Sequence, residues 1–288
     1  MKNKGIKSKS KGEFIAAFAG YAYLTILAIL IVFPFVCAFC SSFKTSREVL
    51  VSGNLLPEKW VVDNYVQAWE KANFATYTWN SAWYSVLFVL IAIFTSTING
   101  YVFARGVFRG KNVIFAIFTS LMFIVLGTSS MYPQIQILKT LGLNTSLVGL
   151  LVKEFFGINI TNVFLVRGFV NSLPMSLDEA AEIDGCSFIK IFFVIILPLL
   201  KPIIATVGIF AFTTAWNDYL MPMVVTLANP MQRPLSVGLV ALQSSADAAA
   251  AWNLILAGGM ISAIPMIIVF LIFNKYFIKG LTAGAVKG

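Results

Sequence analysis

The residues best placed to do chemistry lie in one short acidic run, residues 177–185, which reads LDEAAEIDG. The run holds four of the 12 acidic residues in a chain of 288 residues. The sequence has no histidine, the commonest metal ligand and general base in proteins. Long apolar segments lie on both sides of the run. A charged loop between apolar segments forms a polar surface outside a lipid bilayer, and we expect this surface to contact another protein.

The residue types around this run predict a helix–turn–helix elbow on residues 171–201. Ser176 and Glu179 have the spacing of a capping box, in which each side chain accepts a hydrogen bond from a backbone amide at the start of a helix. The helix that begins there is expected to run to Asp184. Gly185 then supplies the left-handed turn that ends it.

A second, apolar helix is predicted to follow the turn. Ser187 can cap its first turn, and Pro198 is expected to stop it. Its apolar positions are Phe188, Ile191, Phe192 and Ile195. In this arrangement Ala180 and Ala181 present small side chains to a close partner, and the neighbouring acids supply charges for pairing. The alternative is a solvated loop with an ordinary cap, and spacing alone does not decide between the two.

The composition places the chain in a membrane. Hydrophobic residues make up 59% of it and charged residues 11%, whereas a soluble domain carries about 25% charged residues. The mean hydropathy is +0.86. The net charge is +9, but the basic residues cluster between apolar runs, which indicates membrane topology and contact with anionic lipids rather than nucleic acid. We therefore expect a multi-pass protein of the cell (plasma or inner) membrane.

Six apolar segments are long enough to cross a bilayer as helices, since about 20 apolar residues span its core. They cover residues 20–43, 83–104, 113–133, 147–170, 203–226 and 254–278. Lys153 and Glu154 interrupt the fourth. With the N-terminus inside, 14 basic residues fall on the inner side and seven on the outer side. The sequence therefore predicts an all-α integral membrane protein with six spans and both termini in the cytoplasm (N-in/C-in).

These spans divide the chain into five parts. They are a basic cytoplasmic N-terminus (1–19), a first transmembrane helix (20–43), an outer loop (44–82), a transmembrane core (83–278) that contains the elbow at 171–201, and a cytoplasmic tail (279–288). The outer loop is long enough to form short amphipathic helices. Cys37 and Cys40 form a C-x-x-C pair inside an apolar run, where helix packing is favoured over a redox or metal role. No catalytic residue and no metal site is predicted.

Several motifs, in the same order, are similar to those of a known family. The motifs Glu179-Ala180-Ala181, Asp184-Gly185 and Leu197-Pro198 resemble the EAA loop of ABC-importer permeases. The segments LGLNT (141–145), WND (216–218) and GLTAGAVKG (280–288) resemble carbohydrate-uptake permeases of the maltose type, in particular the shorter, six-helix subunit. The resemblance spans residues 44–288. It departs from the family at Cys186, where alanine is expected.

The resemblance implies a type I ABC importer permease, in which the EAA elbow is the coupling helix that a cytoplasmic ATPase moves. Carried over to this sequence, the ATPase-coupling residues are Glu179, Ala180, Ala181, Asp184 and Gly185. The implied partners are a second permease subunit in a heterodimer, an ATPase subunit dimer and an extracytoplasmic sugar-binding protein. The sequence has no G-x-x-x-x-G-K-[ST] motif, so ATP and Mg²⁺ are expected on the ATPase, and no cofactor is expected on this chain. A small-residue, glycine-rich tail is usually disordered, whereas the resemblance implies that this tail reaches the ATPase dimer.

The implied function is ATP-driven, binding-protein-dependent import of sugars or oligosaccharides, and the chain is not expected to be an enzyme. The candidate pathway or substrate residues are Asn99, Trp216, Asn217 and Asp218. A carboxylate that faces lipid costs about 2.5–3.5 kcal/mol, so Asp218 is expected to face protein, water or substrate, or to cap a helix end. Asn99 belongs to a small polar patch that can equally serve helix packing. An ion-coupled secondary transporter is the alternative; only Asp218, with Lys153 and Glu154, could carry its ion coupling.

Overall fold

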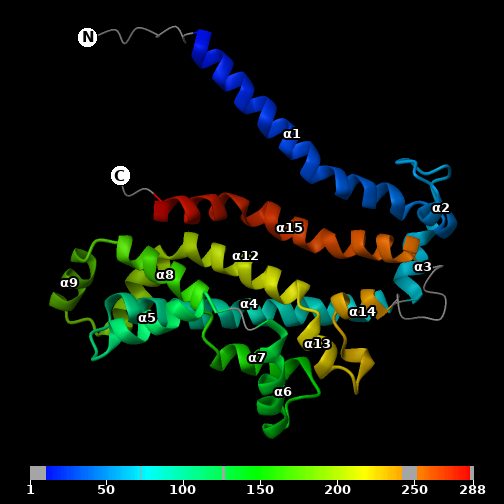
Figure 1. Cartoon of the computed structure of the whole chain (residues 1–288). Coiled ribbons are helices and arrows are strands. Elements are labelled where there is room, and N and C mark those ends of the chain that lie inside the picture. Colours follow the sequence, from blue (N-terminus) through cyan, green and yellow to red (C-terminus); the bar gives the residue numbers. More distant parts are fainter. Residues whose placement is uncertain (1–10, 72, 125–126, 242–251, 286–288) are drawn as a thin grey trace. The chain divides into compact units, whose positions relative to one another are not determined.

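The computed structural model describes residues 11–71, 73–124, 127–241 and 252–285, and all regular secondary structure in these ranges is helical (Figure 1). This confirms the all-α prediction. The elements are α1 (Lys11–Ser42), α2 (Ser46–Val51), α3 (Asp63–Lys71), α4 (Phe74–Arg105), α5 (Lys111–Leu121), η1 (Gly127–Ser130), α6 (Met131–Thr140), α7 (Leu147–Phe156), α8 (Ile160–Ser172), α9 (Ser176–Ile183), α10 (Phe188–Ile191), the π-helical η2 (Phe192–Ile196), α11 (Leu197–Leu199), α12 (Lys201–Asn217), α13 (Leu220–Val225), η3 (Pro230–Gln232), α14 (Leu235–Ala241) and α15 (Trp252–Ala285).

Three described helices are long and apolar enough to cross a membrane, namely Ala17–Ser42 within α1, Phe74–Arg105 (α4) and Trp252–Asn274 within α15. Two bent pairs raise the number to as many as five: α7 with α8, bent by 42°, and Phe188–Leu199 with α12, bent by 80°. The predicted count of six spans stays a prediction.

Three of the predicted spans are not single helices, which corrects the sequence reading of 113–133, 147–170 and 203–226. The first divides because α5 ends at Leu121 and a polar turn with left-handed Gly127 (φ +54°) precedes α6. The second divides before Asn159, whose side chain caps α8. The third divides at Asp218, where the backbone becomes extended between α12 and α13. In the second and third of these runs, polar or glycine residues thus end helices that hydropathy alone joins.

The described residues form two compact units. The first contains residues 11–68 and 252–261. Within it, the predicted outer loop forms the short helices α2 and α3, as expected. The buried Asn64 amide fixes this segment by donating hydrogen bonds to the carbonyls of Ser42 and Lys44, both 2.8 Å. Asn253 in turn donates to the Asn64 side-chain oxygen (2.7 Å).

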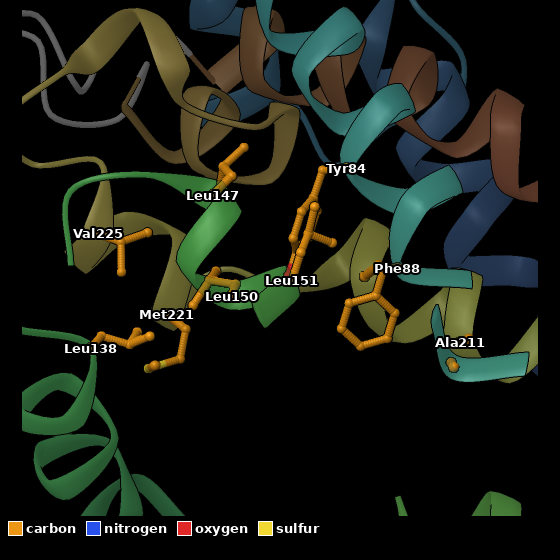
Figure 2. Packing of buried hydrophobic residues seen from close by; sticks show 11 residues of the cluster. Tyr84, Phe88, Leu138, Leu147, Leu150, Leu151, Ala211, Met221 and Val225 are labelled. Atoms are coloured by element: carbon orange, nitrogen blue, oxygen red, sulfur yellow. The ribbon is translucent and has the colours of Figure 1, made fainter. Parts of the chain in front are cut away.

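The second unit contains residues 69–241 and 262–285, and α4 is its central helix. α4 packs against α7, α8, α12 and α14. One buried apolar cluster surrounds its first half, where Tyr84 and Phe88 meet α7 and α13 (Figure 2). A second cluster surrounds its last turns, where Tyr101 meets α8, the segment 188–200 and α12. α4 therefore contacts both ends of the unit.

Candidate functional site

The first helix of the elbow, α9, begins one residue earlier than the predicted cap requires. The N-cap is Met175, which has helical angles, and no side chain caps this end. The amide of Leu177 donates to the carbonyl of Pro174, and that of Glu179 donates to the carbonyl of Met175. The predicted capping box is therefore wrong, because backbone carbonyls already satisfy the amides that the Ser176 side chain was expected to bind.

The other end of α9 matches the prediction. Gly185 is left-handed (φ +75°), and Asp184 is the C-cap. The amide of Cys186 donates to the carbonyl of Ala181 (2.9 Å), and that of Gly185 donates to the carbonyl of Glu182 (3.0 Å). These two bonds form a Schellman motif, which fixes the corner of the elbow.

The second helix also starts as predicted, because the Ser187 side chain accepts a hydrogen bond from the amide of Lys190 (3.4 Å). It does not stop at Pro198. A π-helical turn precedes this proline, α11 contains it, and the 80° bend follows Leu200. A π turn changes the backbone register before a residue that has no amide hydrogen, which explains how the helix continues through proline.

The elbow separates its side chains into an exposed and a buried set. Glu179, Ala180, Asp184 and Gly185 are exposed, together with Glu182. Ala181 is only 5% exposed and packs in the second apolar cluster. The expectation that Ala181 presents its side chain to a partner is therefore wrong, since this chain already covers it.

Sequence reasoning missed the apolar residues on the exposed side of the elbow. Ile183 is 86% exposed and Ile189 is 68% exposed. A surface that combines exposed carboxylates with exposed large apolar side chains is typical of protein–protein contact. The signal was present in the sequence, because Ile183 lies between two acids where a solvated helix would carry a polar residue.

Sequence reasoning also missed that Asp178 attaches the elbow to α4. Its carboxylate forms an ion pair with Nε of Arg105, the last residue of α4, at a distance of 3.1 Å. The Asp178 side chain is 5% exposed and the Arg105 side chain is 10% exposed. Arg105 Nη2 also donates to the carbonyl of Leu173 (2.8 Å). Removing one partner of a buried ion pair costs about 3–5 kcal/mol. The pair therefore links α9 to the end of α4, because the loss of either partner would leave the other charged and buried.

Two more basic residues surround the same end of α4. Lys111 Nζ donates to the carbonyls of Ala104 (3.0 Å) and Gly106 (2.9 Å). Arg167 Nε donates to the carbonyl of Phe103 (3.1 Å). Cations at a helix C-terminus satisfy its free carbonyls and interact favourably with its dipole. The end of α4 that pairs with Asp178 of α9 is thus a rigid support.

The four candidate pathway residues have separate environments. Asn99 donates to the carbonyl of Thr95 in its own helix (2.7 Å). Trp216 is buried, and its indole donates to the carbonyl of Ser262 in α15 (3.0 Å). Asn217 is exposed and donates to the carbonyl of Thr213 (2.9 Å).

Asp218 lies at the break between α12 and α13. Asp218 is the C-cap of α12, and its backbone carbonyl accepts a hydrogen bond from the Ser236 hydroxyl (2.6 Å). This agrees with the helix-end alternative for Asp218. In the described ranges no hydrogen bond joins Asn99 to the other three candidates. Within these ranges, too, no group of three Cys, Asp or Glu side chains is arranged to hold a metal ion.

Comparison with known proteins defines the class. The sequence profile of the family described as "binding-protein-dependent transport system inner membrane component" matches residues 74–283. The chain is 32% identical over 274 residues to the arabinooligosaccharides transport system permease protein of Halalkalibacterium halodurans, covering 93% of this chain and 95% of that protein. It is 30% identical to the galactooligosaccharides transport system permease protein of Bacillus subtilis, over 96% of this chain and 97% of that protein.

A solved structure agrees at the level of the fold. It is a bacterial ABC transporter involved in the import of the acidic polysaccharide alginate, with a TM-score of 0.79, 24% identity, and coverage of 94% of this chain and 100% of that chain. The fold and the relatives are those of a membrane permease of the ABC transporter class. The chain belongs to the family of binding-protein-dependent transport system inner membrane components.

Proposed function

We propose that this permease imports oligosaccharides as a subunit of an ATP-driven transporter, and that α9 is its contact with the ATPase. The observation that carries the proposal is the exposed acidic and apolar face of α9 on a buried ion-paired support. An ATPase that changes shape on binding ATP can move the permease only through a stiff attachment. The Schellman turn at Gly185 and the Arg105–Asp178 pair make this attachment stiff.

The contact residues in this proposal are Glu179, Ala180, Asp184 and Gly185, with Glu182 and Ile183 added by their exposure. Ala181 supports the contact from below by packing into the permease. The partners are an ATPase subunit dimer, which holds ATP and Mg²⁺, a second permease subunit and an extracytoplasmic binding protein. In the predicted topology of six spans with both termini inside, the elbow is cytoplasmic and lies on the same side as the ATPase.

The substrate class rests on the relatives, whose names specify arabinooligosaccharides and galactooligosaccharides. Oligosaccharides bind through amides, hydroxyls and aromatic faces. Asn217 is the candidate whose side chain is exposed, whereas Trp216 bonds to the Ser262 carbonyl and Asp218 is the C-cap of α12. Asn99 remains a second candidate on α4. Of the predicted cytoplasmic tail 279–288, residues 286–288 lie outside the described residues.

Energy dependence tests this function against an ion-coupled transporter. The complete transporter, with its partner permease, ATPase and binding protein, is expressed in cells and supplied with labelled arabinotriose or galactobiose. We expect uptake to fall to background when ATP is depleted and to continue when a protonophore collapses the ion gradient. Uptake that survives ATP depletion and stops with the protonophore would establish the secondary transporter instead.

A further inference from the structure

The C-terminal end of α4 is anchored to the elbow through both polar and aromatic contacts. The Arg105–Asp178 ion pair is the polar contact. One turn earlier, the ring centroid of Tyr101 lies 4.6 Å from that of Phe188 and 5.1 Å from that of Phe192, so the same helix end also holds the second helix of the elbow. We call Arg105 and Asp178 the C-terminal anchor of α4.

The N-terminal end of α4 is anchored to a different segment, Pro230–Ala241. The Asn80 amide donates to the backbone carbonyls of Met231 (2.8 Å) and Arg233 (3.0 Å). The neighbouring Ser81 hydroxyl accepts a hydrogen bond from the amide of Leu235 (2.8 Å). Both side chains are buried, at 9% and 1% exposure. These three bonds, from Asn80 and Ser81, form the N-terminal anchor, and each leaves a buried polar group unsatisfied if it is lost.

Steric contact reinforces the N-terminal anchor. A methyl group added at Gly238 of α14 would come within 2.1 Å of the Tyr77 ring, so α14 lies directly against α4. α4 is one uninterrupted helix of 32 residues without proline. Its stretch from Asn80 to Arg105, between the two anchors, corresponds to roughly 38 Å. α4 also packs closely against α8. A methyl group at Gly100 would come within 2.5 Å of Val166 in α8, so the two helices leave no room between them at this position.

We propose that α4 is a rigid connecting helix through which the segment Pro230–Ala241 and the elbow move together, with Asn80 and Asp178 as the positioning residues at its two ends. The inference rests on the proposed function, in which these ends face opposite sides of the membrane. A helix held at both ends transmits displacement, since neither end can shift without breaking buried hydrogen bonds or a buried ion pair. By thermodynamic linkage, a partner bound at one end then biases the state at the other end.

The test measures whether nucleotide at the elbow end changes the opposite end. The assembled transporter, with Cys37, Cys40 and Cys186 replaced by serine, carries Met231→Cys and is placed in lipid nanodiscs. Met231 suits the probe because its side chain is 56% exposed. The rate of alkylation by a charged maleimide is measured with ATP plus vanadate and without nucleotide. We expect the two rates to differ by about fivefold or more, the low end of a typical allosteric coupling.

Variants at each anchor test whether α4 transmits the effect of nucleotide. Asn80→Leu and Asp178→Asn should each bring the ratio of the two rates close to one. Thr95→Val is the matched control on the same helix, since the Thr95 hydroxyl bonds only to carbonyls of α4 itself, and it should keep the full difference. Asp178→Asn alone leaves the buried charge of Arg105 unpaired and could prevent assembly for that reason. The double variant Arg105→Gln, Asp178→Asn removes this charge and should then restore assembly. Copurification of the ATPase verifies assembly in every variant.

Two results would overturn the proposal. One is an Asn80→Leu transporter that assembles and keeps the full nucleotide effect. The other is an unaltered transporter that takes up oligosaccharide with ATP but shows equal alkylation rates with and without nucleotide. The second result leaves the proposed function intact. Failure of the proposed function is recognised separately, as the absence of any ATP-dependent uptake by the unaltered transporter.

Discussion

At the scale of single residues, the elbow assigns opposite tasks to neighbouring acids. Asp178 is buried and neutralised by Arg105, whereas Glu179 is exposed. Adjacent residues on a helix point about 100° apart, so one faces the permease and the next faces outward. A substitution at Asp178 therefore acts on the support, and a substitution at Glu179 acts on the partner surface.

Glu179→Arg should abolish uptake while membrane insertion and the amount of protein remain normal. The reason is that the side chain is exposed, so reversal of its charge disturbs the ATPase contact and leaves the fold unchanged. Glu179→Asp keeps the charge and is the matched control, which should retain most of the uptake. Labelled oligosaccharide uptake is measured together with the membrane content of each variant. Normal uptake by Glu179→Arg would remove Glu179 from the coupling contact.

At the scale of elements, the corner of the elbow depends on a backbone conformation that few residues adopt. Gly185 has φ +75°, and a side chain there meets no atom within 4 Å. The requirement is therefore conformational rather than steric. Only glycine, and to a lesser degree asparagine, adopts this left-handed region at low cost.

Gly185→Pro should abolish uptake without preventing insertion. Proline fixes φ at about −65° and removes the amide that donates to Glu182, so the Schellman turn cannot form and α9 loses its angle. Gly185→Asn is the control, because asparagine tolerates the left-handed conformation and keeps the amide. Uptake by the two variants is compared at equal membrane content. Equal loss of uptake in both variants would contradict the role given to the turn, and so would normal uptake by both variants.

Local signals predicted part of the elbow. The Ser176 capping box and the stop at Pro198 are wrong for local backbone reasons, and long-range contacts explain the errors in burial and pairing. The glycine turn and the Ser187 cap depend on neighbouring residues only, and both are confirmed. Burial of Ala181 and the pairing of Asp178 depend on α4, which is distant in sequence, so periodicity within a short helix could not reveal them. Two of the broken spans have another cause, because hydropathy averages over the polar residues Asn159 and Asp218 at the helix ends.

At the scale of the whole molecule, composition and motif order identified the class that the comparisons show. The resemblance was read from motifs spread over residues 44–288, and the family profile matches residues 74–283. The number of membrane crossings and the sidedness of the elbow follow from the distribution of basic residues and stay predictions. The central claim, that α9 faces the cytoplasm and receives the ATPase, depends on this sidedness.

Labelling of a single cysteine tests that claim most directly. Glu182→Cys, in a background where Cys37, Cys40 and Cys186 are serine, places a thiol on the exposed face of α9. It is treated with a membrane-impermeant maleimide in intact cells and in inverted membrane vesicles, with and without the bound ATPase. We expect labelling only in inverted vesicles stripped of the ATPase, with protection when the ATPase is restored. Labelling in intact cells, or labelling that the ATPase does not reduce, would contradict the account.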